Sequence, residues 1–152
     1  MKILVDADAC PVRKIIVSVA KEYDLEVIMF TDTSHILAED DCFKAVLVDK
    51  AKDSVDIALI NKTDEGDIVI TQDYGLAAMA LAKRAAVIHH NGWFYNERNI
   101  DIILFERHIS AKARRAGVKS NSNKKRSREN DLKFETCLRN IIEKKIKEVH
   151  NS

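Results

Sequence analysis

Apolar positions follow two different spacings along the first ninety residues of the chain. Short, nearly continuous apolar runs predict buried strands at residues 2–6, 25–30, 44–48, 67–71 and 86–89. Between them, apolar residues recur every three or four positions, which predicts helices at residues 11–23, 54–62 and 74–84. Strands that alternate with helices form parallel βαβ units with right-handed crossovers. We therefore expect an α/β fold, a three-layer α/β/α sandwich around a mainly parallel sheet.

The pattern changes after Gly92. Residues 99–116 predict a helix with no strand behind it, and Gly117 is its expected stop. Residues 118–128 are a linker rich in serine, asparagine and lysine, and an apolar stripe predicts a last helix at residues 131–149. We expect an α/β domain at residues 1–117. The remainder, residues 118–152, is expected to be a basic linker and a C-terminal helix that packs on the domain or extends from it.

Composition and length narrow the class of protein. The chain has 152 residues, of which 46% are hydrophobic and 32% charged, as is ordinary for one globular domain with its own core. There is no apolar run of membrane-spanning length and no basic segment followed by a cleavable apolar one. Cys10, Cys42 and Cys137 are odd in number and lack metal-ligand spacing, which favours free thiols. We expect a cytoplasmic protein without a membrane partner; a homo-oligomer is compatible with this composition.

Charge is distributed unevenly between the two parts of the chain. Residues 1–100 carry 11 basic and 17 acidic side chains, whereas residues 101–152 carry 14 basic and 7 acidic ones. Residues 110–128 contain eight basic residues and no acid. Such a run attracts the phosphate backbone of nucleic acid without sequence specificity, although a solvated linker would look similar. The expected contacts to nucleic acid are Arg114, Arg115, Lys124, Lys125, Arg126 and Arg128.

Aspartates lie at the carboxyl ends of two of the expected strands. Asp6 ends the first strand and Asp8 comes two residues later, and Asp73 comes two residues after the fourth strand. These strands are neighbours in the commonest doubly wound order, so the three acids would converge where open α/β sheets bind ligands. Asp56, in an otherwise apolar helix, is a fourth candidate. Clustered carboxylates repel one another unless a cation neutralises them, which predicts a site for Mg²⁺ or Mn²⁺.

The acids occur in an order that resembles the PIN-domain ribonucleases. An aspartate ends the first strand, Asp56 lies in a helix, and Thr71, Asp73, Leu76 and Ala77 form a Thr-x-Asp-x-x-Leu-Ala motif. A closer resemblance, over nearly the whole length, is to the bacterial YaiI/YqxD family, which is PIN-like in fold. It is carried by residues 6–11, 71–73, 99–101, 114–117, 124–126 and Phe134.

The PIN resemblance implies a hydrolase that cleaves RNA phosphodiester bonds with divalent metal. It implies that Asp6, Asp56 and Asp73 are metal ligands and that Asp8 is an additional acid. PIN domains usually present a glutamate where this chain has the shorter Asp56, so one metal or two remain alternative interpretations. In the one-metal interpretation Asp8 orients the attacking water. Asp6, Asp8 and Asp73 are thus the expected catalytic residues, and Thr71 is expected to bind a substrate phosphate or to orient Asp73.

Each candidate site residue could also have a purely structural role. Asp6, Asp8 and Asp73 could cap the helices that follow them, and Asp56 could lie on a solvated helix face. Asp67 precedes its strand, at the end of the sheet away from the site, and is expected to be structural. Asp49 is expected to be a solvated loop acid. His89 and His90 are expected to end their strand, and contact with a substrate phosphate is the alternative. The aromatic residues at positions 93–95 are expected in the core rather than stacked on bases.

Two alternative functions remain. The chain could be a non-catalytic nucleic-acid-binding module with a PIN-like fold, in which the basic tail binds and the acids are structural. It could also be a phosphatase of the haloacid-dehalogenase type, with Asp6 as nucleophile and Asp8 as general acid. The lysine and the later acid pair that such a phosphatase needs are not evident in the sequence.

Overall fold

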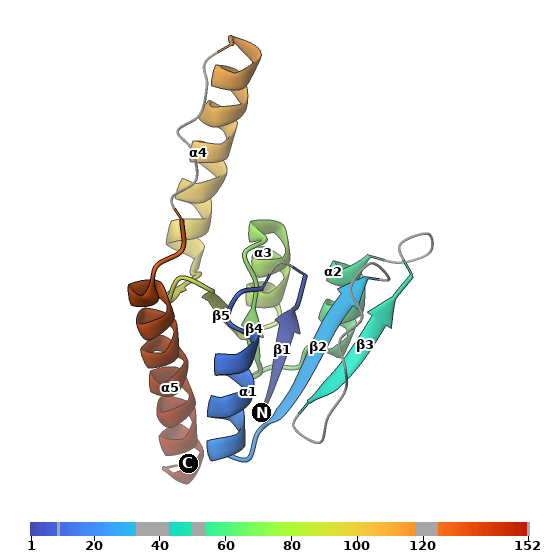
Figure 1. Cartoon of the computed structure of the whole chain (residues 1–152), viewed down its shortest axis with the longest axis vertical. Coiled ribbons are helices and arrows are strands. Elements are labelled where there is room, and N and C mark those ends of the chain that lie inside the picture. The colour runs from blue at the N-terminus through green and yellow to red at the C-terminus, as the bar shows by residue number, and fades with distance from the viewer. Residues whose placement is uncertain (9, 33–42, 50–53, 118–124, 152) are drawn as a thin grey trace.

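A computed structural model of the chain describes residues 1–8, 10–32, 43–49, 54–117 and 125–151. It contains one six-stranded sheet in the order β3-β2-β1-β4-β5-β6, and all neighbouring strands are parallel except β5 and β6 (Figure 1). The strands are β1 (Lys2–Asp6), β2 (Glu26–Asp32), β3 (Lys44–Val48), β4 (Ile68–Ile70), β5 (Ala86–His89) and β6 (Trp93–Phe94). The helices are α1 (Arg13–Glu22), α2 (Val55–Lys62), α3 (Tyr74–Ala82), α4 (Glu97–Arg115) and α5 (Arg128–His150). The three-layer α/β fold expected from the sequence is confirmed.

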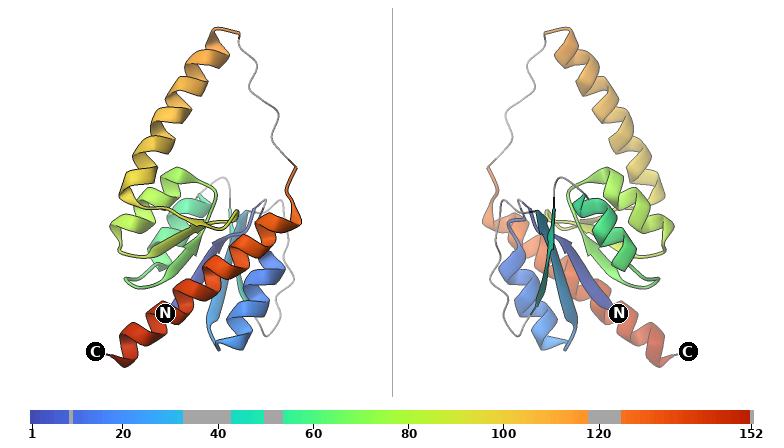
Figure 2. Two further views of the ribbon diagram at one scale, coloured as in Figure 1. Left: turned by 90° about the vertical axis from the view of Figure 1, so that its left-hand side faces the viewer. Right: turned by 90° about the vertical axis from the view of Figure 1, so that its right-hand side faces the viewer.

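The two faces of the sheet are covered by different helices. Side chains alternate between the faces along a strand, so Ile3 and Val5 of β1 point one way and Leu4 points the other. The first face packs against α1 and α5, and the second against α2, α3 and the start of α4 (Figure 2). The central strand β1 is therefore buried on both sides, which explains its continuous apolar run.

The strand order places a switch point beside β1. The chain leaves β1 through α1 to reach β2 and β3 on one side, and it returns through α2 to β4 on the other side. In the register of the sheet, Val5 lies opposite Ile70, so Asp6 and Thr71 are neighbours at the carboxyl ends of their strands. Crevices at such switch points are where open α/β sheets bind ligands.

The structure differs from the sequence prediction after β5. Strand β6 is only two residues long and antiparallel, so it left no periodic signal to detect. Helix α4 begins at Glu97, because Asn96 and Asn99 form a reciprocal capping box. Helix α5 begins at Arg128, because Ser127 caps it, so Arg128 belongs to the helix and not to the linker.

Helix α5 packs on the body of the molecule, whereas α4 projects from it (Figures 1 and 2). Phe134, Leu138 and Ile142 of α5 are fully buried in the same core as α1. At Gly92, before β6, the backbone has φ +87° and a Cβ would lie 2.5 Å from the carbonyl carbon of Lys133, so only glycine lets α5 come this close. Within the described ranges, no helix is both long and apolar enough to cross a membrane.

Candidate functional site

Asp6 and Thr71 form the centre of the candidate site, at the carboxyl ends of β1 and β4. Asp6 is the last residue of β1 and is partly buried, and Thr71 is 2% exposed. The Thr71 hydroxyl donates a hydrogen bond of 3.1 Å to Oδ2 of Asp6. Thr71 Oγ1 also accepts a hydrogen bond from the Asp73 N–H, which fits the expectation that Thr71 orients Asp73, whereas phosphate binding by Thr71 stays a prediction.

Asp73 is connected to this pair through Thr71. Its backbone N–H donates to Thr71 Oγ1 at 2.9 Å, and its Oδ1 accepts hydrogen bonds from Gly75 and Leu76, which caps α3. The capping role considered from the sequence is therefore present. The cap hydrogen bonds involve only Oδ1, so capping and ligand binding through Oδ2 are compatible at Asp73.

Asp56 belongs to the same cluster, although it comes from the first turn of α2. It is partly buried, and its pKa is raised by burial and, next, by the negative charge of Asp73 and a hydrogen bond with it. Asp56 therefore does not lie on a fully solvated helix face, which was the structural alternative predicted for it. Ser54 caps α2 through the Ile57 N–H at 3.1 Å and so fixes the position of the first turn.

Asp8 lies beyond the end of β1 and ties this segment to β2. Its Oδ1 accepts a hydrogen bond of 2.6 Å from the Thr31 hydroxyl, and its Oδ2 accepts one of 3.2 Å from the Asp32 N–H. These contacts give Asp8 a positioning role beside any chemical one. Asp32, at the end of β2, is an acid at this edge that sequence reasoning missed. The position of Asp32 directly after an apolar strand could have identified it, as it did Asp6 and Asp73.

The four predicted aspartates act on one another electrostatically. The pKa of Asp6 is raised to about 6, first by burial and then by the negative charges of Asp56, Asp8 and Asp73, while the Thr71 hydrogen bond lowers it. Three carboxylates from three different segments therefore lie close enough to disfavour the ionised form of Asp6. Such a site gains from a proton or from a cation.

The donor set suits a hard divalent cation, but it is not assembled into a finished metal site. Carboxylate oxygens are the ligands that Mg²⁺ and Mn²⁺ prefer. Across the described residues, no three His, Cys, Asp or Glu side chains are already grouped to hold a metal. Asp6 with Asp73, and Asp8 or Asp56 after a side-chain rotation, are the residues that would hold one.

A small hollow adjoins Asp6 and is completed by residues that the sequence did not assign to the site. Its lining includes Asp6, Asp8 and Thr71, together with Cys10, Gln72 and His90. His90 is half-buried, and the pKa of its imidazole is lowered by burial and, less strongly, by Arg126. Of the two histidines at the end of β5, His89 and His90, only His90 lines this hollow.

The other aromatic residues near this edge are structural. His89 stacks on Trp93 at 4.5 Å, its Nδ1 accepts the Asn91 N–H, and burial lowers its pKa to about 4. Tyr95 is 4% exposed, as expected for a core residue, but the same expectation for Phe94 was wrong, because its side chain is 38% exposed. Asp67, at the other end of the sheet, accepts a hydrogen bond of 2.6 Å from Lys2 Nζ, which confirms its structural role.

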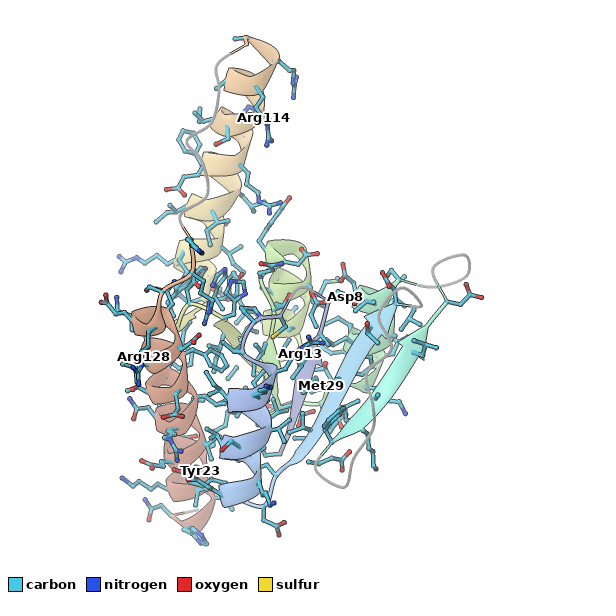
Figure 3. The ribbon with its side chains drawn as sticks, in the orientation of Figure 1. Asp8, Arg13, Tyr23, Met29, Arg114 and Arg128 are labelled. Carbon is cyan, nitrogen blue, oxygen red and sulfur yellow. The ribbon has the colours of Figure 1, made fainter. Side chains whose placement is uncertain are left out.

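The predicted basic contacts fall in three places. Arg114 and Arg115 are exposed in the last turn of α4, and Figure 3 shows Arg114 near the far end of this helix, with Asp8 at the edge of the sheet from which α4 rises. Lys125 and Arg128 are exposed at the start of α5. Lys124 lies outside the described residues.

Arg126 differs from the other predicted basic contacts because its guanidinium is engaged inside the protein. It forms an ion pair with Asp131 at 2.7 Å and donates to the Asn91 side chain and to the His90 carbonyl, each at 2.8 Å. Arg126 therefore joins the start of α5 to the turn between β5 and β6. This geometry supports a structural role for Arg126 more directly than the predicted contact with substrate.

The fold and this edge define a class: an α/β protein with an acidic cluster at the switch point of its sheet. The chain belongs to the YaiI/YqxD family, because the family model described as "Uncharacterized BCR, YaiI/YqxD family" matches residues 4–144. It is 56% identical to a UPF0178 protein of Ruminiclostridium cellulolyticum over 138 residues, 91% of this chain and 90% of the relative. It is 50% identical to a UPF0178 protein of Alkaliphilus oremlandii over 146 residues, 96% and 94% of the two chains. No solved structure matches the chain.

Proposed function

We propose that this protein is a divalent-metal-dependent nuclease that hydrolyses phosphodiester bonds of RNA at the carboxyl edge of β1 and β4. The observation that carries the proposal is that four aspartates gather at this edge: Asp6 and Asp8 line one hollow, and Thr71 joins Asp6 to Asp73. The negative charges of Asp56, Asp8 and Asp73 add to the burial that raises the pKa of Asp6 to about 6. Three carboxylates around a partly buried fourth need a cation when RNA, itself anionic, is brought to them. The choice of RNA rests on the resemblance to PIN domains.

In this proposal Asp6 and Asp73 bind Mg²⁺ or Mn²⁺, which would supply a water of lowered pKa to attack phosphorus. Thr71 keeps the two carboxylates in register, since it donates to Asp6 and accepts from the Asp73 N–H. Asp8 is anchored by Thr31 and Asp32 at the opposite side of Asp6. From that position it can hold a water by hydrogen bonding and take its proton.

The second half of α4 is the proposed guide for the RNA backbone. After Glu106 the helix carries Arg107, Lys112, Arg114 and Arg115 and no acid. It rises from the same edge of the sheet as the acidic cluster (Figure 1), and Arg107 lies 4.1 Å over the ring of Tyr74, next to Asp73. A phosphate backbone running along α4 would therefore reach the cluster at the base of this helix.

The test is cleavage of a fluorophore-labelled single-stranded RNA by purified protein with Mn²⁺ or Mg²⁺, compared with EDTA. We expect Asp6→Asn and Asp73→Asn to lower the rate at least about a hundredfold, as loss of a metal-assisted step does. Asp24→Asn is the matched control, because Asp24 is exposed, far from the edge, and has φ 54°, which asparagine tolerates. Cleavage retained in both site variants would show that the proposal is wrong.

The non-catalytic RNA-binding module is the second candidate, and one observation favours it. Within the part of the chain that the structure describes, no metal-holding group is already assembled. A melting experiment separates the two candidates, because a cation that binds only the folded state raises its melting temperature. The nuclease requires a rise with Mn²⁺ that Asp6→Asn abolishes. RNA binding without any Mn²⁺-dependent rise would instead support the binding module.

A further inference from the structure

Helix α4 carries an apolar stripe that faces away from the body. Ile102, Phe105 and Ile109 are 55%, 66% and 48% exposed, and they are spaced by three and four residues. Ile100 and Ile103, which pack against the core, lie on the opposite side of the helix at 3.6 residues per turn. Large exposed apolar residues aligned in this way are typical of a helix that packs against another helix.

We propose that α4 pairs with α4 of a second copy of this chain, in an antiparallel arrangement around a two-fold axis near Phe105. Spacing by three and four residues is the pattern of a coiled-coil seam. In a two-fold pair, Ile102 of one copy lies opposite Ile109 of the other, and the two Phe105 side chains meet at the centre. The surface is therefore complementary to itself, as a closed dimer requires.

Charge fixes the direction of the pairing. The flank of the stripe carries Glu97 and Asp101 in the first half of α4 and Lys112 and Arg115 in the second half, all exposed. In an antiparallel pair, this flank of one α4 faces the same flank of the other α4, which runs in the reverse direction. Glu97 therefore faces Arg115, and Asp101 faces Lys112. A parallel pair would place the acidic first halves at one end and the basic second halves at the other, so these acids would not face these bases.

The arrangement leaves part of the proposed guide for RNA open. Arg107 and Arg114 lie on the side of α4 toward Ile103, whereas Lys112 and Arg115 would face the second copy. Helix α4 leaves its own body at its first turns. In an antiparallel pair, the two bodies therefore lie at opposite ends of the helix pair. This dimer does not depend on the nuclease proposal.

The expected dimer is weak and reversible. Helix α4 has 19 residues and is therefore about 28 Å long, and its first turns also contact the body. A single helix pair of this length falls below the standard interface size of about 1,600 Å². We expect a dissociation constant of about 10–100 μM, typical of small interfaces.

Sedimentation equilibrium of the full chain, from about 2 to 500 μM, tests the proposal. We expect the average mass to rise toward that of a dimer, and Phe105→Glu to weaken association at least about tenfold. Leu132→Glu is the matched control, because Leu132 is also exposed on a helix, at 60%, but lies on α5. Circular dichroism and thermal melting confirm that both variants remain folded.

Exchanging the charges of Asp101 and Lys112 tests whether the two helices pair in the antiparallel direction. Asp101→Lys and Lys112→Asp should each weaken the dimer, and the double variant should restore it, because each flank then again faces its opposite. Failure of the double variant to restore association would exclude the antiparallel pair. A monomer at every concentration, or equal association of Phe105→Glu and wild type, would overturn the dimer itself. If Phe105→Glu lowered affinity for single-stranded RNA and left the mass unchanged, the stripe would be a base-stacking surface and the proposal would be wrong.

Discussion

Replacing Asp6 by asparagine should stabilise the protein at neutral pH in the absence of metal. The folded-state pKa of Asp6 is about 6, compared with its ordinary value of 3.8. Between these values the folded state binds more protons than the unfolded state, so stability falls as pH rises from about 4 to about 6. Above pH 6 the ionised carboxylate costs at most about 3 kcal/mol, since one pKa unit corresponds to about 1.4 kcal/mol.

Asparagine has nearly the same shape and still accepts the Thr71 hydrogen bond, but it carries no charge. At pH 8 in EDTA we expect Asp6→Asn to melt about 4–10 °C higher than wild type, at about 2–4 °C per kcal/mol for a chain of this size. At pH 4 the difference should nearly vanish, because wild-type Asp6 is then protonated when folded. Urea unfolding at the two pH values measures the same difference as a free energy.

Asp24→Asn serves as the control, since Asp24 is exposed and outside the cluster. An Asp6→Asn variant that is no more stable than wild type at pH 8, while the control behaves as wild type, would contradict the electrostatic reasoning. Adding Mn²⁺ should make wild type more stable than Asp6→Asn, because only wild type retains the full set of carboxylates that bind the cation.

Three further predictions concern the fold and the site, and five variants test them. Gly92→Ala should lower stability by at least about 2 kcal/mol, because φ is +87° and the new Cβ would meet the Lys133 backbone; urea unfolding measures this. Thr71→Val should cost about 1–3 kcal/mol by removing a hydrogen-bonding hydroxyl at a buried position, whereas Thr71→Ser should retain most of the stability; equal losses would show that the hydroxyl is unimportant. Arg126→Met should lower the melting temperature and leave RNA affinity unchanged, because its guanidinium holds the protein together. Arg114→Ala should lower RNA affinity in a binding titration and leave the melting temperature unchanged.

The sequence was sufficient for the strands and for the sheet edge. The strands β1, β3 and β5 were predicted at their observed bounds, because each is a short apolar run between turns. The expectation that residues 44–48 are buried was wrong, since β3 is at the edge of the sheet and Leu47 is 58% exposed. The adjacency of β1 and β4, and hence of Asp6 and Thr71, followed from the usual doubly wound order. Side-chain hydrogen bonds at the ends of strands could not be predicted, because they depend on rotamers and on the exact register.

The structural roles of Asp8 and Arg126 were not predicted from the sequence. Both looked like residues available to substrate, since a charged residue in a loop or linker is usually exposed. In the structure, Asp8 accepts hydrogen bonds from the end of β2, and Arg126 joins α5 to the turn before β6. Strand β6 has only two residues, and without it the site of Arg126 was not foreseeable.

The position of β1 in the middle of the sheet affects when the acidic cluster can form during synthesis. The hydrogen bond from Thr71 to Asp6 closes a separation of 65 residues, and β4 must be available before β1 has its second neighbour. Until then, β1 is an apolar strand with one open edge, a form prone to wrong pairing. Asp6 places a charge at the end of this strand, a feature that disfavours wrong pairing, and the same charge is unfavourable in the folded protein.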